Sequence, residues 1–86
     1  MENIPIEMKN DYILIKDIKN ETISGVYIPD ERYNRYARVL KTNKNSILNV
    51  GDVIIKPIGR ATPIKINGET YDCLKEGFVF AKIIKD

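Results

Sequence analysis

The hydrophobic residues of this chain occur in short runs separated by polar turn residues. The run at residues 12–16 is β-branched and aromatic and too short for a stable helix, so it predicts a strand. Residues 36–40 predict a second strand. Residues 53–56 predict a third, which follows turn residues 49–52 and is expected to be buried on both faces. The pattern indicates no helix.

Asn67-Gly68 is the clearest turn signal, because a type I′ turn needs positive φ at both central positions. The flanking residues 63–66 and 69–74 are therefore predicted to form a hairpin. Its register turns one apolar face toward the core. The cross-strand pairs expected are Ile64 with Tyr71 and Lys65 with Thr70.

The end of the chain predicts one more turn and one more strand. Residues 75–77 are turn-forming, and residues 78–84 are mostly apolar and read as a last strand. Five or six short strands separated by turns indicate an all-β fold, either a small antiparallel β-barrel or a sandwich. At 86 residues the chain is expected to form a single domain spanning residues 1–86.

An apolar triplet, Val26-Tyr27-Ile28, lies between Gly25 and Pro29 in a polar part of the chain. Gly25 loosens the backbone before the triplet and Pro29 ends any hydrogen-bonded ladder after it, which favours a loop over a central strand. Large apolar side chains on a loop are typical of a partner-binding segment. The alternative is a short buried strand.

Composition argues against several classes of function. The net charge of +2, from 14 basic and 12 acidic residues, is too balanced to indicate a nucleic acid or an acidic membrane as the main partner. The chain has no histidine and one cysteine, Cys73, so the usual general bases and metal ligands are missing. We therefore expect no enzymatic activity, no cofactor and no metal.

The sequence also favours a cytoplasmic protein that is not processed. A lone cysteine fits a reducing compartment, no run is long enough to span a membrane, and the first residues lack the pattern of a signal peptide. One stretch, residues 32–38, interleaves arginines with aromatic rings as single-strand binders do. The balanced total charge favours a loop whose rings pack and whose charges are solvated, so nucleic acid is not the expected partner.

The order of these segments resembles the GroES-type co-chaperonins over nearly the whole chain. The most specific parts are the Gly-apolar-apolar-apolar-Pro segment at residues 25–29 and the Val-Gly-Asp step at residues 50–52. The resemblance implies a Greek-key-like β-barrel subunit with one long mobile loop, at about residues 19–35. Seven such subunits would form a ring, a homo-heptamer, that caps a GroEL-type chaperonin, and ATP or ADP would be bound by that partner.

The resemblance also implies two sets of site residues. The mobile loop would bind the chaperonin through Gly25, Val26, Tyr27, Ile28 and Pro29. The ring interface would pair the first strand of one subunit with the last strand of its neighbour. Its residues would be Ile4, Pro5, Ile6, Phe80, Ile83 and Ile84, although ordinary core packing is the alternative for Phe80 and Ile83.

One departure from the family concerns the roof of the ring. Only residues 43–49 occupy the interval where family members carry a roof hairpin, so we expect a ring with an open or wider top. Such trimming suits a reduced, phage-encoded co-chaperonin acting in the host cytoplasm. It also suits a structural ring or adaptor protein of a phage particle that keeps the fold without chaperone activity.

Overall fold

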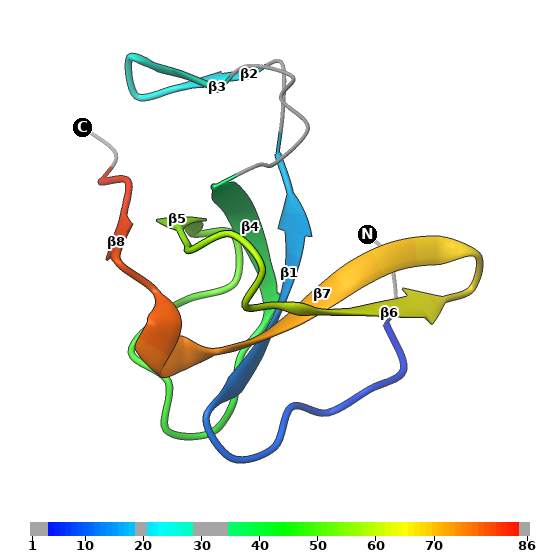
Figure 1. Cartoon of the computed structure of the whole chain (residues 1–86). Coiled ribbons are helices and arrows are strands. Elements are labelled where there is room, and N and C mark those ends of the chain that lie inside the picture. Colours follow the sequence, from blue (N-terminus) through cyan, green and yellow to red (C-terminus); the bar gives the residue numbers. More distant parts are fainter. Residues whose placement is uncertain (1–3, 19–20, 29–34, 85–86) are drawn as a thin grey trace.

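The structure, a computed structural model, describes residues 4–18, 21–28 and 35–84. In these ranges the strands form two antiparallel sheets, a six-stranded sheet in the order β6-β7-β1-β4-β5-β8 and a two-stranded sheet of β2 and β3 (Figure 1). The strands are β1 (Tyr12–Asp17), β2 (Glu21–Ile23), β3 (Val26–Ile28), β4 (Tyr36–Lys41), β5 (Val53–Ile55), β6 (Thr62–Ile66), β7 (Glu69–Lys75) and β8 (Ala81–Lys82).

The expected all-β antiparallel fold is confirmed, whereas a closed barrel is not found. Strands β6 and β8 lie at the two ends of the sheet order and do not pair with each other, so the described strands leave the sheet open. Helical structure in the described ranges is limited to one 3₁₀ turn, η1 (Glu76–Phe78). It is far too short to cross a membrane, and no other described segment is a helix that could.

Strand β1 is central to the six-stranded sheet, where it pairs with β7 on one side and β4 on the other. Three successive side chains, Ile13, Leu14 and Ile15, are fully buried. Because successive side chains of a strand point to opposite faces, the sheet must be covered on both sides here. Ile13 and Ile15 pack in one core cluster with Val39, and Leu14 packs in another with Tyr71.

The segment before β1 supplies the cover for the second face. Ile4 and Met8 are buried in the cluster that contains Leu14 and Tyr71. This segment contains no strand among its described residues, so its contribution comes from side-chain packing.

The predicted hairpin at Asn67-Gly68 is confirmed. Both turn residues have positive φ, 52° for Asn67 and 83° for Gly68. The register pairs Ile64 with Tyr71 and Lys65 with Thr70, as the sequence predicts. Ile64 packs against the cluster of Tyr71, so the expected inward face is also confirmed.

The predicted last strand at residues 78–84 is wrong in its extent. Only Ala81–Lys82 is a strand, and Phe78 belongs to the 3₁₀ turn η1. The Val79 amide donates to the Glu76 carbonyl at 3.0 Å, and this closed turn redirects the chain before it can pair with β5. The predicted burial of the strand at residues 53–56 is confirmed, since Val53, Ile54 and Lys56 are buried and Ile55 is half-buried.

The Asn67-Gly68 turn gives a test of backbone strain. Gly68→Ala places a Cβ on a residue with φ of 83°, so we expect a loss of about 1 kcal/mol in the free energy of unfolding, measured by urea denaturation. Gly77→Ala is the control, because φ there is not in the left-handed region and a Cβ meets no atom within 4 Å. Equal losses in the two variants contradict the strain argument.

Candidate partner-binding site

The predicted partner-binding triplet forms strand β3 of a small hairpin. Strand β3 pairs with β2, with Thr22 opposite Tyr27 and Ile23 opposite Val26. The turn residues Ser24 and Gly25 have φ of 49° and 83°, the backbone of a type I′ turn. Gly25 therefore supplies the backbone freedom expected of it, but within a hairpin rather than an irregular loop.

The hairpin divides the triplet between its two faces. Tyr27 is 61% exposed on the outer face, whereas Ile28 is fully buried on the inner face. Val26 lies between these extremes at 37%. The middle residue of the triplet is therefore accessible, whereas its last residue belongs to the core, as in the alternative of a short buried strand. Pro29, with residues 19–20 and 30–34 of the expected mobile loop, lies outside the described residues.

The inner face of the hairpin packs on the body of the protein. Ile23 and Ile28 form a buried cluster with Ile18, which follows β1, and with Val53 of β5. Half-buried Ile83, beside β8, packs against the same cluster. In Figure 1 the hairpin lies beyond the ends of β1 and β4, set apart from the six-stranded sheet. These few side chains therefore hold it in place.

A buried cation lies where the chain leaves the sheet for the hairpin. The Lys56 ammonium is buried and lies 3.2 Å from the Asp17 carboxylate at the end of β1. The Lys56 amide donates to the Arg35 carbonyl at 2.7 Å, and the Ile18 amide donates to the Tyr36 carbonyl at 3.1 Å. These contacts fix the two points at which the hairpin excursion begins and ends.

A second carboxyl group lies near this ion pair. Burial of the Asp72 side chain raises the pKa of its carboxyl group, the negative charge of Asp17 raises it further, and the positive charge of Lys56 partly offsets both. Asp72 is the β7 partner of Ile15, so it lies two positions along β1 from Asp17 on the same face. The positive charge of Lys56 therefore acts on the carboxyl groups of both Asp17 and Asp72.

Strand β8 forms one edge of the six-stranded sheet and carries two of the predicted ring-interface residues on its flanks. Phe80 is 68% exposed and Ile84 is 75% exposed. The Phe80 and Ile83 amides donate to β5 at 2.8 Å each, which fixes the strand on one side only. Ile83 turns inward to the hairpin cluster instead.

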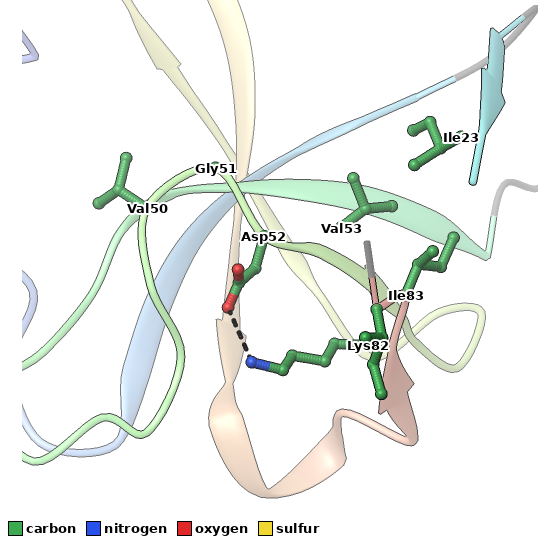
Figure 2. A pocket seen from close by; sticks show the side chains of 8 residues that line it. Ile23, Val50, Gly51, Asp52, Val53, Lys82 and Ile83 are labelled. Atoms are coloured by element: carbon green, nitrogen blue, oxygen red, sulfur yellow. Dashed lines mark ion pairs between the residues drawn. The ribbon is translucent and has the colours of Figure 1, made fainter. Parts of the chain in front are cut away.

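A cavity of about 290 Å³ lies between β8, β5 and the hairpin. Figure 2 shows Ile23, Val53 and Ile83 on one side of it, with Asp52 and Lys82 joined by an ion pair across the other. The ion-pair distance is 3.6 Å. The cavity therefore has apolar walls and a charged rim.

A second cavity of about 300 Å³ lies on the other side of β8, which shares Lys82 with the first. Its wall includes Phe80 and Ile47, and Ile47 is 84% exposed. Glu76 lies at its margin, where one carboxylate oxygen accepts from the Ile47 amide at 3.3 Å. Two apolar hollows therefore flank the exposed edge of β8.

The N-terminal residues of the predicted ring interface are less accessible than those beside β8. Ile4 is buried in the core beneath β7, Ile6 is half-buried, and Pro5 is exposed. The N-terminal segment and β8 lie on opposite sides of the molecule (Figure 1). They therefore do not meet within one chain.

The described residues offer little for metal or nucleophilic chemistry. Within them no three His, Cys, Asp or Glu side chains gather as a metal site requires. Burial raises the pKa of the half-buried Cys73 thiol, and the charge of Asp72 raises it further, which disfavours the reactive thiolate.

The stretch considered for nucleic acid is only partly described, since residues 32–34 lie outside the described ranges. Arg35 is exposed, and Arg38 and Tyr36 are half-buried. The Tyr36 ring packs against the cluster beneath the hairpin. It is therefore not a free stacking platform for a base.

Sequence reasoning missed two residues of this site, Ile23 and Lys56. The signal for Ile23 was available, because Ser24-Gly25 is a turn dipeptide and a hairpin around it places Ile23 opposite Val26, on the same face as Ile28. The ion pair of Lys56 with Asp17 could not be predicted, because the two residues are distant in sequence and no local pattern indicates that they lie together.

A scan against protein-family models finds no match for this chain, and no curated protein matches its sequence. The site is therefore interpreted from its own geometry.

The ion pair between buried Lys56 and partly exposed Asp17 predicts a loss of stability on removal of Asp17. Asp17→Asn leaves the buried Lys56 ammonium without this carboxylate, so we expect a loss of about 1–2 kcal/mol in the free energy of unfolding, measured with urea at neutral pH. Glu7→Gln is the matched control, because the Glu7–Lys9 pair is exposed on both sides. Its expected effect is below about 0.5 kcal/mol, and an equal loss at both sites contradicts the role of burial.

The raised pKa of Asp72 predicts a pH dependence of stability. The folded chain holds this proton more tightly than the unfolded chain, so stability falls as pH rises from the unfolded pKa through the folded pKa. Asp72→Asn removes that fall. In urea unfolding between about pH 3 and pH 7, the variant should gain stability relative to the natural chain as pH rises. A constant difference between the two contradicts the prediction.

Proposed function

We propose that this chain is a co-chaperonin-like ring subunit that caps a GroEL-type chaperonin and assists protein folding. The observation that carries the proposal is the exposed Val26–Tyr27 pair on a hairpin set apart from the main sheet (Figure 1). Large exposed apolar side chains on a projecting element of a small protein are typical of a partner-binding segment. The partner, not this chain, binds ATP or ADP.

The free energy available from one hairpin suits a contact that is weak for a single subunit and becomes strong when several subunits bind together. Burial of an apolar side chain contributes about 1.5–3 kcal/mol, so Val26 and Tyr27 of a single hairpin give a weak contact. A ring that presents several hairpins makes each later contact intramolecular and raises the avidity without tightening any one contact. A lid that must bind and release in turn needs this combination.

The exposed apolar edge at β8 supports assembly into a ring, whereas Ile4 of the N-terminal segment is buried in its own subunit. The edge of β8 presents Phe80 and Ile84, while the segment with Ile4, Pro5 and Ile6 lies on the opposite side of the molecule. Contacts between two different surfaces of identical chains close into a ring when the rotation per subunit allows it. We propose a homo-heptamer on the resemblance to the GroES-type family.

The loop at residues 43–49 supports a reduced form of this lid. It contains no strand, so the roof hairpin of the family has no counterpart in this interval. A phage-encoded co-chaperonin in the host cytoplasm is the setting we propose. A ring with an open top would enlarge the chamber beneath it.

The burial of Ile28 favours a second candidate, a structural ring or adaptor protein of a phage particle. In that case the hairpin is a fixed part of the subunit, and Tyr27 contacts a permanent neighbour. Detection of the chain in purified virions, together with no affinity for chaperonin, supports this candidate against the first.

The proposal predicts that Tyr27→Asp abolishes capping. A charge in the centre of the apolar contact opposes its burial, so the variant should lose retention on a GroEL-type chaperonin in the presence of ADP. The measurement is a nucleotide-dependent pull-down, with native mass spectrometry to show that ring size is unchanged.

Tyr12→Asp is the matched control, because Tyr12 is also an exposed tyrosine but begins β1 at the end far from the hairpin. It should bind as the natural chain does. Retention of the Tyr27→Asp variant, or no retention of the natural chain, contradicts the proposed function.

A further inference from the structure

We propose that the β2–β3 hairpin is a latch, closed on the body of its own subunit by Ile23 and Ile28, and that it must open before the whole triplet can contact a partner. This inference rests on the proposed function. It adds a regulatory step to it, in which the binding segment is held by the protein that carries it.

Ile28 belongs to the triplet that would contact the proposed partner, but it is buried in the closed hairpin. Tyr27 faces outward, but Ile28 is fully buried against Ile18 and Val53. In the closed hairpin a partner can therefore reach Tyr27 and only part of Val26. The contact of the full triplet competes with the contact between Ile28 and the body.

Opening of the hairpin breaks no described backbone ladder between the two sheets. Strands β2 and β3 form a sheet of their own, which has no described ladder to the six-stranded sheet. What holds the hairpin closed is thus a set of side-chain contacts, with Ile23 and Ile28 on the moving side. Opening this contact requires less than unfolding of β1 or β4.

The joint between the hairpin and the body is bordered by a pocket on one side. This pocket of about 290 Å³ opens to solvent beside Ile23, Val53 and Ile83 (Figure 2), and the exposed residues Val50 and Ile84 also line it. Side chains that border such a pocket lack packing partners on that side. The latch is therefore held less firmly than the core around β1.

The root of the hairpin provides a fixed pivot. The ion pair of Lys56 with Asp17, and the hydrogen bonds from the Lys56 and Ile18 amides, tie the chain to the sheet on both sides of the excursion. Opening can therefore leave the six-stranded sheet unchanged.

The latch predicts that Ile23→Ala strengthens partner binding. Ile23 closes the latch but is not part of the triplet, so its truncation favours the open state without removing a partner contact. The loss of one buried isoleucine side chain shifts such an equilibrium about tenfold or more. We expect association with a GroEL-type chaperonin in ADP to be faster by a similar factor, measured by surface plasmon resonance.

Thr22→Ala is the matched control, because Thr22 lies in the same strand on the exposed face. It should associate at the natural rate. Ile18→Ala removes the body side of the same contact and should act in the same direction as Ile23→Ala. If both isoleucine variants associate with the chaperonin at or below the rate of the natural chain, the latch is overturned. Retention of the natural chain on the chaperonin would still support the proposed function in that case.

Hydrogen exchange tests the latch without any partner. A two-stranded hairpin is marginally stable alone, so its amides exchange when it opens. Ile23→Ala should raise exchange in the hairpin about tenfold and leave β1 unchanged, which also shows that the variant is folded. Unchanged hairpin exchange, or equal acceleration in β1, overturns the latch whether or not the chaperonin is bound.

Discussion

The burial of β1 on both faces is the constraint on which the rest of this small protein depends. Ile13, Leu14 and Ile15 are all inaccessible, so each face of the sheet needs its own cover. The hairpin of β6 and β7 and the N-terminal segment cover the side of Leu14, and β5 with its neighbours covers the other. An 86-residue chain has little apolar surface to spare after this, which limits how the remaining elements can be held.

Because little apolar surface is left, few side chains pack the β2–β3 hairpin on the body of the protein. The hairpin leaves the sheet at the end of β1, where the ion pair of buried Lys56 with partly exposed Asp17 lies at its root, and it contacts the body through Ile23 and Ile28. The same alternation that buries Ile28 exposes Tyr27. The residue that stabilises the hairpin and the residue that is accessible to the proposed partner are therefore neighbours in one three-residue strand.

The sequence predicts elements whose signal is local. The Asn67-Gly68 turn and the register of Ile64 with Tyr71 are confirmed, because backbone sterics and side-chain alternation determine them within a few residues. The last strand was wrong in extent, because the turn at Glu76 and the pairing with β5 are both needed to place it. In the candidate site, the exposure of Tyr27 agreed with the expectation, whereas the burial of Ile28 depends on Val53, which is distant in sequence.

Strand β8 is only two residues long, and its shortness limits what its open edge can offer to another strand. A long open edge offers backbone hydrogen bonds to any strand, whereas an edge of two residues offers a foreign strand very few. The choice between one strand and another would then depend on the side chains that line the two cavities beside β8. Phe80 and Ile47 line one cavity, and Ile84 lines the other. The short edge can therefore remain exposed beside large apolar side chains without acting as a general template for aggregation.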